Sequence, residues 1–411
     1  MGISTKVEKQ KQPSTLGLVL LVVGIIFIAM NLRAPITSVG PVASLIRDNL
    51  HISNTMVGVL TTIPLLTFGV LSPFAPKLAR RFGMELTLFF VLIVLTIGLI
   101  LRPFAGIIPL YVGTLFIGAG IAVANVLMPA FVKMKFPKNI GVMTGIYSIS
   151  MNLTAALAAG LSVPLSKMHD ASWKLSIGIW MIVGILAILF WLPQLRNRVK
   201  TTSGKGQTAK KSSLLRSPLA WKITIFMGLQ SLLFYCIAAW LPEILQGRGM
   251  SANKAGWMLS SVQFAQLPVT FIAPIIAGKM KNQIALVWLT FVTAILGIVC
   301  IMSGIMVLVL PAAILFGIAT GLAFSLAMMF FTLRTDDVFE AADLSAMAQS
   351  IGYLVAASGP VIFGILFDMT DTWTSSLVLL LVASLILLIV GLGAGKQTTI
   401  AQEAEKHASS M

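Results

Sequence analysis

The sequence predicts an all-α integral membrane protein with twelve transmembrane helices, and three observations support this fold class. First, 57% of the 411 residues are hydrophobic and only 10% are charged, with a mean hydropathy of +0.97, whereas soluble domains carry about 25% charged residues. Second, the apolar residues gather in runs of about 20, the length that crosses the hydrocarbon core of a bilayer. Third, the charged residues fall mainly between these runs. A water-soluble fold is therefore excluded.

Twelve apolar runs follow one another along the chain, and each is expected to be helical because lipid offers the backbone no hydrogen-bond partner. The first six begin near Leu16, Met56, Met84, Ile107, Lys138 and Trp173. The second six begin near Leu219, Ala252, Ile284, Val307, Ala342 and Trp373. Gly and Pro interrupt several runs, which membrane helices tolerate, so the boundaries are expected to shift by a few residues.

The distribution of Lys and Arg predicts which ends of the spans lie in the cytoplasm, because basic loops are retained on the inner side. With both termini inside, the inner segments hold 22 basic residues and the outer loops hold 6. The predicted parts are a tail (1–15), an N-terminal six-helix half (16–195), a basic linker (196–217), a C-terminal six-helix half (218–394) and a second tail (395–411). The net charge of +16 then reflects orientation and contact with anionic membrane lipids, and no nucleic acid is expected as a partner.

The two halves match each other when the sequence is moved along itself by 198 positions. This offset places Gly58 on Gly256 and Pro76 on Pro274 without a gap. Two parallel six-helix halves joined by a basic cytoplasmic loop resemble the major facilitator fold. In that fold the halves face one another across a central cavity and rock to open it alternately to either side.

The inner loop between spans two and three resembles a motif of that superfamily, which usually reads G-x-x-x-D-R-x-G. Here the loop reads PKLARRFG, so Arg81 and Gly83 are kept while Arg80 replaces the Asp. The resemblance implies a gate at Arg80, Arg81 and Gly83, but the salt bridge normally attributed to the loop lacks its acid. In the second half, Gly359 and Pro360 give span eleven a point at which it could bend, and they are further candidates for gating.

Four other segments resemble the cyanate permease and 2-nitroimidazole transporter branch of the facilitators. They are Asn31–Pro41, Ala124–Lys133, Gly141–Ser148 and Ala239–Pro242. This resemblance covers essentially the whole chain. It implies a small, compact, polar or anionic substrate without naming the molecule.

Polar side chains at membrane depth indicate which spans surround a cavity, because such groups avoid lipid. Spans three, six, nine and twelve hold only a few Ser and Thr in their interiors and are expected to face lipid. The candidate substrate-binding residues lie in the other spans: Asn31, Arg33, Thr37, Asn125, Tyr147, Asn152, Gln230, Tyr235, Gln263, Gln266, Gln349 and Tyr353. The alternative is that Asn and Gln join helices through hydrogen bonds, worth about 0.6–2 kcal/mol each.

Arg33 is the one basic residue that falls well within a predicted span, and no Asp or Glu accompanies it in the sequence. A charge at the bilayer centre costs at least about 2.5 kcal/mol. One interpretation is that a carboxylate or other anion of the substrate pairs with the guanidinium group. The other is that Arg33 binds carbonyl groups where Pro35 and Pro41 disturb the helix, or extends toward water. We favour the first, because ionisable groups inside the membrane are functional by default.

Several function classes are excluded by what the sequence lacks. All thirteen acidic residues lie in loops, tails or helix ends, so coupling would use the substrate's own proton or an exchanged anion instead of a deep carboxylate. Uniport without a coupling ion is also allowed. No phosphate-binding loop and no arrangement of nucleophile and base is present. We therefore expect no enzyme activity, no cofactor and no metal site.

The leading hypothesis is a monomeric transporter in a bacterial cell membrane, secondary active or facilitative. It would move a small polar, anionic solute by alternating access. A second hypothesis is an exporter of uncharged nitro-heteroaromatic or drug-like compounds, because the 21 Met and 23 Phe could form an adaptable cavity. A transporter-derived sensor is disfavoured, because the chain has no room for a second, cytoplasmic core.

Overall fold

Twelve helices long and apolar enough to cross a membrane are present in the computed structural model, among the residues that it describes: 15–52, 54–104, 106–168, 173–197 and 214–409. The predicted N-terminal tail, except Thr15, and most of the predicted linker lie outside these residues. The first six spans are formed by α1 (Thr15–Asn31) with α2 (Ala34–Thr37), α4 (Asn54–Leu71), α6 (Met84–Leu101), α7 (Ile107–Lys135), α8 (Ile140–Ser166), and α9 (Trp173–Gly178) with α10 (Trp180–Trp191). The second six are α12 (Pro218–Gln246), α13 (Ala252–Lys279), α14 (Ile284–Met302), α15 (Val309–Leu333), α16 (Val338–Thr370) and α17 (Trp373–Ala394).

Short helices connect or follow the spans: η1 (Gly40–Val42), α3 (Ala43–Leu50), η2 (Ser72–Phe74), α5 (Ala75–Phe82), η3 (Leu192–Asn197), η5 (Met306–Leu308) and α18 (Ile400–Ser409). The prediction of an all-α chain with twelve candidate spans is thus confirmed for the described residues. The predicted orientation of the termini stays a prediction.

The predicted start of each span lies within four residues of an observed helix start. The largest difference is at α16, which begins at Val338 and not at Ala342. The carboxylate of Asp337 accepts hydrogen bonds from the backbone N–H groups of Phe339 and Glu340. Such a cap stabilises the first turn of a helix even where its residues are polar, so a search for apolar runs detects the helix one turn late.

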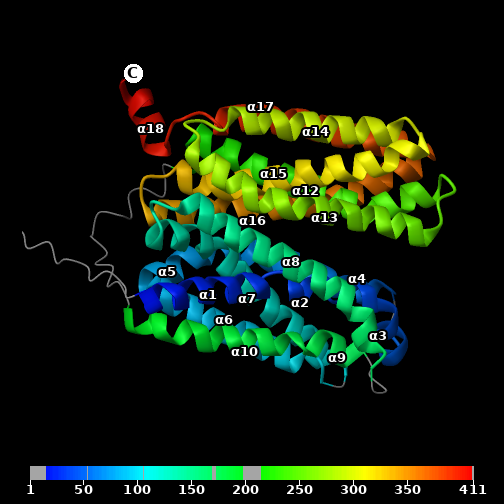
Figure 1. Ribbon diagram of the computed structural model, residues 1–411, viewed down its shortest axis with the longest axis horizontal. Coiled ribbons are helices and arrows are strands. Elements are labelled where there is room, and N and C mark those ends of the chain that lie inside the picture. Colours follow the sequence, from blue (N-terminus) through cyan, green and yellow to red (C-terminus); the bar gives the residue numbers. More distant parts are fainter. Residues whose placement is uncertain (1–14, 53, 105, 169–172, 198–213, 410–411) are drawn as a thin grey trace, which may run out of the picture.

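The spans form two groups that lie against each other along their length (Figure 1). In the first group α6 packs on α7 and α10, and α1 packs on α10. In the second group α13 packs on α15, α12 on α16, and α14 on both α15 and α17. Helices α6 and α10 lie at the outer edge of the first group, and α14 and α17 at that of the second (Figure 1). The four spans without strongly polar residues therefore lie farthest from the boundary between the groups, as their composition predicts.

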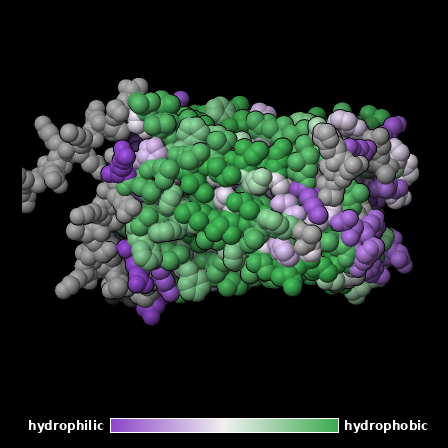
Figure 2. Space-filling model, turned by 90° about the horizontal axis from the view of Figure 1, so that it is seen from below, coloured by the Kyte–Doolittle hydropathy of each residue, from purple (hydrophilic) through white to green (hydrophobic). Residues whose placement is uncertain are grey.

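The two ends of the bundle differ in the elements that they carry. One end holds α5 and α18, and we name it the linker end because η3 and the start of α12 flank the linker there (Figure 1). The opposite end, named the far end, holds α3. Figure 2 shows a broad apolar band between more polar ends on one face of the molecule. This is the surface expected of a protein embedded in lipid.

Both halves hold the end of their fourth span in the same way. In the first half Lys135 forms an ion pair with the buried carboxylate of Glu85, at the start of α6, with 2.7 Å between Nζ and Oε1. In the second half Arg334 donates to Oε1 of Gln283 and to the carbonyl of Ala394. Glu85 and Gln283 are 198 positions apart, the offset at which the halves match. The shared contact supports an internal duplication.

We predict that Gly317 is required for the close packing of α15 on α13. A Cβ atom at Gly317 would lie 2.6 Å from Cβ of Ala265 and would also clash with the carbonyl of Val262. G317V should therefore lower the free energy of unfolding by about 1–3 kcal/mol, measured as a lower Tm of the purified protein. G160V is the matched control, because a Cβ atom there would meet nothing within 4 Å. Equal losses in the two variants would contradict the prediction.

Candidate functional site

The first span is interrupted at Arg33. Helix α1 ends at Asn31 and α2 begins at Ala34, and Arg33 lies between them with φ −129° and ψ −36°. Pro35 occupies the first turn of α2, where its missing N–H leaves no hydrogen bond unmade and its fixed φ favours a helix start. The interruption places a half-buried guanidinium group within the bundle.

The guanidinium of Arg33 is held by one amide and two aromatic rings. Its Nη1 donates to Oδ1 of Asn152 at 2.8 Å, and Nδ2 of Asn152 donates to the carbonyl of Ser148 at 3.0 Å. Its Cζ lies 5.3 Å from the ring centre of Phe234 and 5.2 Å from that of Phe324, within the range of cation–π attraction. In the described part of the chain no acid pairs with Arg33, and no backbone carbonyl accepts from its guanidinium. The charge therefore lacks a protein counter-ion there.

Arg33 lines an opening between the two groups of helices, with an empty volume of about 300 Å³. The facing wall comes from α12, α13, α15 and α16. The lining residues are Arg33, Gln230, Ser231, Phe234, Tyr235, Gln266, Thr320, Phe324 and Tyr353. Gln266 is 2% exposed, and no group of the described residues donates a hydrogen bond to its Oε1. The opening thus combines one cation with neutral hydrogen-bonding and aromatic groups, and its lining includes no acid.

Sequence reasoning found part of this lining and missed the rest. Four of the predicted residues line the opening together with Arg33: Gln230, Tyr235, Gln266 and Tyr353. The missed residues include Phe234 and, on span ten, Thr320 and Phe324. The sequence analysis names no candidate on span ten, and Phe and Thr are common in any membrane helix. The available signal was their spacing of four, which places Thr320 and Phe324 on one face of α15.

Seven of the predicted residues are not part of this lining, and three of these are Asn31, Thr37 and Gln263. Asn31 is 1% exposed, and its Nδ2 donates to the carbonyl of Val183 on α10 at 3.2 Å. The Oγ1 of Thr37 donates to the carbonyl of Ala155 on α8 at 3.1 Å. These two side chains join helices of the first half. Their contacts agree with the alternative interpretation, in which polar residues join helices through hydrogen bonds. Gln263 is half-buried on α13 and is not part of the lining.

Asn125, Tyr147 and Gln349 form a buried network on the linker side of the opening. The Tyr147 hydroxyl donates to Oδ1 of Asn125 at 3.2 Å. The Nε2 of Gln349 donates to the carbonyl of Asn125 at 3.1 Å and to Oγ of Ser345 at 2.9 Å. Because Gln349 belongs to α16 and Asn125 to α7, this bond links the two halves. These three predicted residues therefore form a floor beneath the opening.

Helices α8 and α13 touch toward the linker end and separate toward the far end. A Cβ atom at Gly145 on α8 would lie 2.6 Å from the carbonyl oxygen of Phe271 on α13. Continuing the same antiparallel register toward the far end brings Gly160 opposite Gly256. A Cβ atom at either position would meet nothing within 4 Å. The gap between the halves therefore widens toward the far end.

An ion pair joins the halves at the linker end. Arg80 on α5 donates from Nη1 to Oδ1 of Asp343 on α16 at 2.9 Å, and from Nη2 to Oδ2. The loop itself lacks the acid of the motif, as its sequence shows, and the acid that pairs with Arg80 comes from the other half. Arg81 is exposed and makes no such link, while Gly83 has φ 84° and turns the chain from α5 into α6.

Lys133 adds a second link between the halves at this end. Its Nζ donates to the carbonyl of Thr332 and to Oγ1 of Thr335, both at 2.9 Å, and also to the carbonyl of Thr335. The last carbonyl groups of α15 have no partner within the helix, and a cation there satisfies them. Lys133 thus fastens the end of α7 to the end of α15.

Gly359 and Pro360 do not lie at a break, because α16 continues through Pro360. A Cβ atom at Gly359 would lie 2.6 Å from Cγ of Leu232 on α12. The carbonyl of Pro360 accepts a hydrogen bond from Nε1 of Trp240, also on α12, at 2.9 Å. In this structure the two residues serve the packing of α16 on α12 within one half, and their role in gating stays a prediction.

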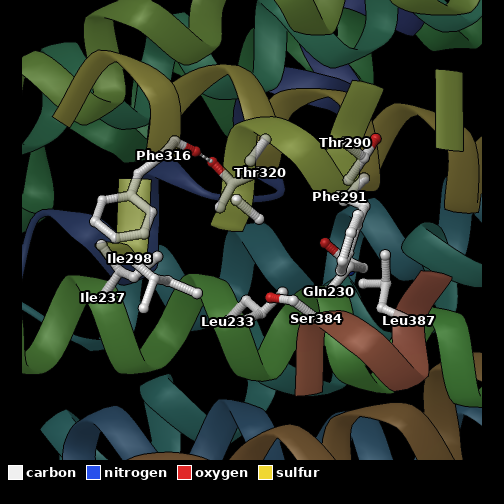
Figure 3. Close-up of a pocket in the computed structure, with 13 residues that line it drawn as sticks. Gln230, Leu233, Ile237, Thr290, Phe291, Ile298, Phe316, Thr320, Ser384 and Leu387 are labelled. Atoms are coloured by element: carbon white, nitrogen blue, oxygen red, sulfur yellow. Dashed lines mark hydrogen bonds between the residues drawn. The ribbon is translucent and has the colours of Figure 1, made fainter. Parts of the chain in front are cut away.

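A second cavity lies inside the second half, beside the opening (Figure 3). It is bounded by α12, α14, α15 and α17, with an empty volume of about 370 Å³. Gln230 and Thr320 line both spaces. The rest of the lining is mainly apolar, with Leu233, Phe291 and Phe316 among it, and includes no charged side chain. This cavity offers contact to apolar atoms but no cation to pair with an anion.

Residues 19–360 match the Major Facilitator Superfamily. The uncharacterized transporter YycB of Bacillus subtilis (strain 168) is 45% identical over 390 residues, covering 95% of this chain and 96% of that protein. The 2-nitroimidazole transporter of Escherichia coli (strain K12) is 35% identical over 387 residues, covering 93% and 97%. The cyanate transport protein CynX of the same strain is 23% identical over 350 residues, covering 85% and 90%. The resemblance stated from the sequence motifs is thereby confirmed.

Solved structures share the fold. The proton:xylose symporter XylE, bound to 6-bromo-6-deoxy-D-glucose, matches with a TM-score of 0.73 over 95% of this chain and 98% of that one, at 12% identity. The transporter FucP, in the outward conformation, matches with a TM-score of 0.71 over 92% and 99%, also at 12% identity. At such low identity the likeness concerns the fold alone, and it agrees with the fold predicted from the duplicated halves.

We predict that charge reversal on one side of the Arg80–Asp343 pair opens the linker end. R80D or D343R would set like charges against each other, while the double variant R80D/D343R restores an attractive pair. In a background with C236A and C300A, maleimide labelling of S345C reports access to the floor beside Gln349. We expect labelling about tenfold faster in each single variant, equivalent to about 1.4 kcal/mol, and near-normal labelling in the double variant. A double variant as reactive as the singles would show that this pair does not close the end.

Proposed function

Because the chain belongs to the major facilitator superfamily, we propose that it is a secondary transporter that moves a small anionic solute across the bacterial cell membrane. The chain is a multi-pass membrane protein, and the family consists of transporters, not enzymes. One observation carries the choice of an anion. The guanidinium of Arg33 lines an opening between the halves and has no acidic partner in the described residues.

The chemistry of the opening supports a carboxylate or a similarly small anion. The Nη1 of Arg33 donates one N–H to Asn152. The remaining N–H groups of the planar guanidinium can donate to two oxygen atoms that lie side by side. Removing the Arg33 guanidinium from water without a counter-ion costs free energy in the folded protein. An anion that binds there offsets part of this desolvation cost. The unpaired Oε1 of Gln266 can accept a hydrogen bond from a hydroxyl or N–H group of the same solute.

The contacts between the halves support alternating access. They gather at the linker end, through Arg80, Lys133 and Gln349, whereas α8 and α13 diverge toward the far end. The excess of basic residues at the linker end supports a cytoplasmic position for that end. The opening would then face outward, and the opposite state requires these contacts to break while new ones form at the far end.

Coupling to a solute-borne proton or to an exchanged anion fits the positions of the acidic groups. Among the described residues, Glu85 and Glu340 are the buried carboxylates, and Asp343 is half-buried. Glu85 pairs with Lys135 and Asp343 with Arg80, while Glu340 accepts a hydrogen bond from the backbone N–H of Asp336. All three lie at the linker end, away from the opening. A carboxylate that pairs permanently with a cation holds its negative charge and is a poor proton carrier.

A second candidate function is export of uncharged nitro-heteroaromatic compounds. It is favoured by the relative named 2-nitroimidazole transporter and by the apolar cavity beside the opening. A nitro group presents two oxygen atoms in one plane, as a carboxylate does, and could accept hydrogen bonds from Arg33. The two candidate functions therefore share a binding residue and differ in the charge of the solute.

We predict that R33Q abolishes stabilisation of the protein by small anions. A ligand that binds the folded state raises its Tm, so benzoate and cyanate should each raise the Tm of the wild-type protein. Loss of a charge-assisted pair should weaken binding by about 10- to 100-fold. R33K should retain part of the effect as a point charge. R47Q, at an exposed arginine of the far end, is the control and should respond like wild type.

The same titrations separate the two candidate functions. If benzoate and cyanate raise the Tm of the wild-type protein and R33Q removes the response, the anion proposal is supported. If the anions raise the Tm of R33Q as much as that of the wild-type protein, the proposed role of Arg33 in binding the anion is wrong. If 2-nitroimidazole stabilises the protein while neither anion does, export of uncharged compounds replaces the anion proposal.

A further inference from the structure

Arg102, the residue that follows α6, is almost completely buried. It is one of the six basic residues that the sequence predicts for the outer loops, yet the residue is 1% exposed and, in the described ranges, forms no ion pair. Its Nη1 donates to the carbonyl of Pro35, and its Nε has no partner. Burial lowers the pKa of Arg102 to about 10, so the guanidinium stays protonated near neutral pH. A buried cation that has no acidic partner in the described residues requires a reason.

The carbonyl of Pro35 has no backbone donor in the described structure. In a regular helix it would accept from the N–H of Val39, four residues later. The N–H of Val39 instead donates to the carbonyl of Ile36 at 3.3 Å. Only side chains reach the Pro35 carbonyl: Oγ of Ser38 at 3.3 Å, and the guanidinium of Arg102. Arg102 therefore supplies a hydrogen bond that the helix cannot supply itself.

This carbonyl belongs to the segment that carries Arg33. Helix α2 has only four residues, and Pro35 is the second of them. On the α8 side the segment is held through Thr37 and through Ser162, whose Oγ donates to the carbonyl of Ser38 at 2.9 Å. Arg102 holds it from the side of α6. Two neighbouring helices thus fix the short piece of chain from which Arg33 projects.

Close packing of α6 on α7 brings Arg102 into this position. A Cβ atom at Gly113 on α7 would lie 3.0 Å from the backbone nitrogen of Arg102 and 3.1 Å from its Cα. A Cβ atom at Gly98 on α6 would lie 2.6 Å from the carbonyl oxygen of Gly113. The two glycines let the end of α6 press against α7. The position of Arg102 is therefore built into the packing of the first half.

We propose that Arg102 is a positioning residue for the anion site: by binding the carbonyl of Pro35, it fixes the break between α1 and α2 and hence the direction of Arg33. This inference rests on the proposed role of Arg33 in binding the solute. An ionised donor makes a stronger hydrogen bond than a neutral one, and the rigid guanidinium fork loses little freedom in making it. Arg102 acts on the solute only through Arg33.

The chain offers a matched control at Arg248. This arginine follows α12, also lies at the far end, and donates from Nη1 to the backbone carbonyl of Ile301, on α14. This hydrogen bond involves neither α1 nor α2. R102M and R102K are therefore compared with R248M and R248K in the purified full-length protein. Three quantities are measured: the Tm, hydrogen exchange of the backbone amides of residues 36–39, and the Kd of benzoate from ligand-induced shifts in Tm.

We expect R102M to accelerate exchange at residues 36–39 about tenfold and to weaken benzoate binding about tenfold. R102K keeps a cationic donor, so its exchange rate and its Kd should lie close to those of the wild-type protein. If R102M does not fold, R102K is the variant compared with R248K. R248M should lower the Tm while leaving the exchange and the Kd unchanged. The proposal is overturned if R102M and R102K behave like R248M, or if exchange rises while the Kd stays the same.

The two readouts also separate this inference from the proposed function. If benzoate does not bind the wild-type protein, the proposed function fails for this ligand class and positioning of an anion site fails with it. The exchange data then show independently whether Arg102 holds the break. If benzoate binds and R33Q abolishes binding while R102M does not weaken it, the proposed function stands and the positioning role is overturned.

Discussion

The structure depends on one constraint, which is that a guanidinium group lies inside a lipid-embedded bundle without an acidic partner in the described residues. Arg33 can occupy this place because the first span breaks beside it and because Asn152 orients it. The faces of two aromatic rings attract the guanidinium without neutralising its charge. The guanidinium of Arg33 is thus an oriented cation that lines the opening. We propose that a bound anion offsets the energetic cost of that arrangement.

The halves meet unevenly, and this unevenness gives the opening its direction. Contacts through Arg80, Lys133 and Gln349 close the linker end, whereas Gly160 and Gly256 face empty space near the far end. Several of the polar contacts at this end are made to backbone carbonyls or to a single carboxylate. Links of this kind can be exchanged for others at similar energy, which a rocking mechanism requires. Arg80 stands where the motif has Asp, and the acid that pairs with it, Asp343, lies on the other half.

The sequence predicts the spans well and the site only in part, for physical reasons. Lipid forces every span to be apolar and helical, so the helix starts are predicted closely. Polarity at membrane depth shows only that a side chain avoids lipid, and a helix–helix contact satisfies that as well as a cavity does. Both outcomes occur in this structure. Tyr235 and Gln266 line the opening, whereas Asn31 joins two helices of one half. Partners far apart in sequence, such as Arg102 and Pro35, emerge only once the helices are packed.

The most direct test of the account is to locate a bound anion. Crystals of the protein grown with 4-bromobenzoate would reveal the ligand through the anomalous signal of bromine. The account predicts a bromine peak in the opening lined by Tyr235 and Phe324, with the carboxylate about 3 Å from the guanidinium nitrogens of Arg33. A ligand bound elsewhere, or an Arg33 guanidinium found paired with a protein carboxylate, would contradict it.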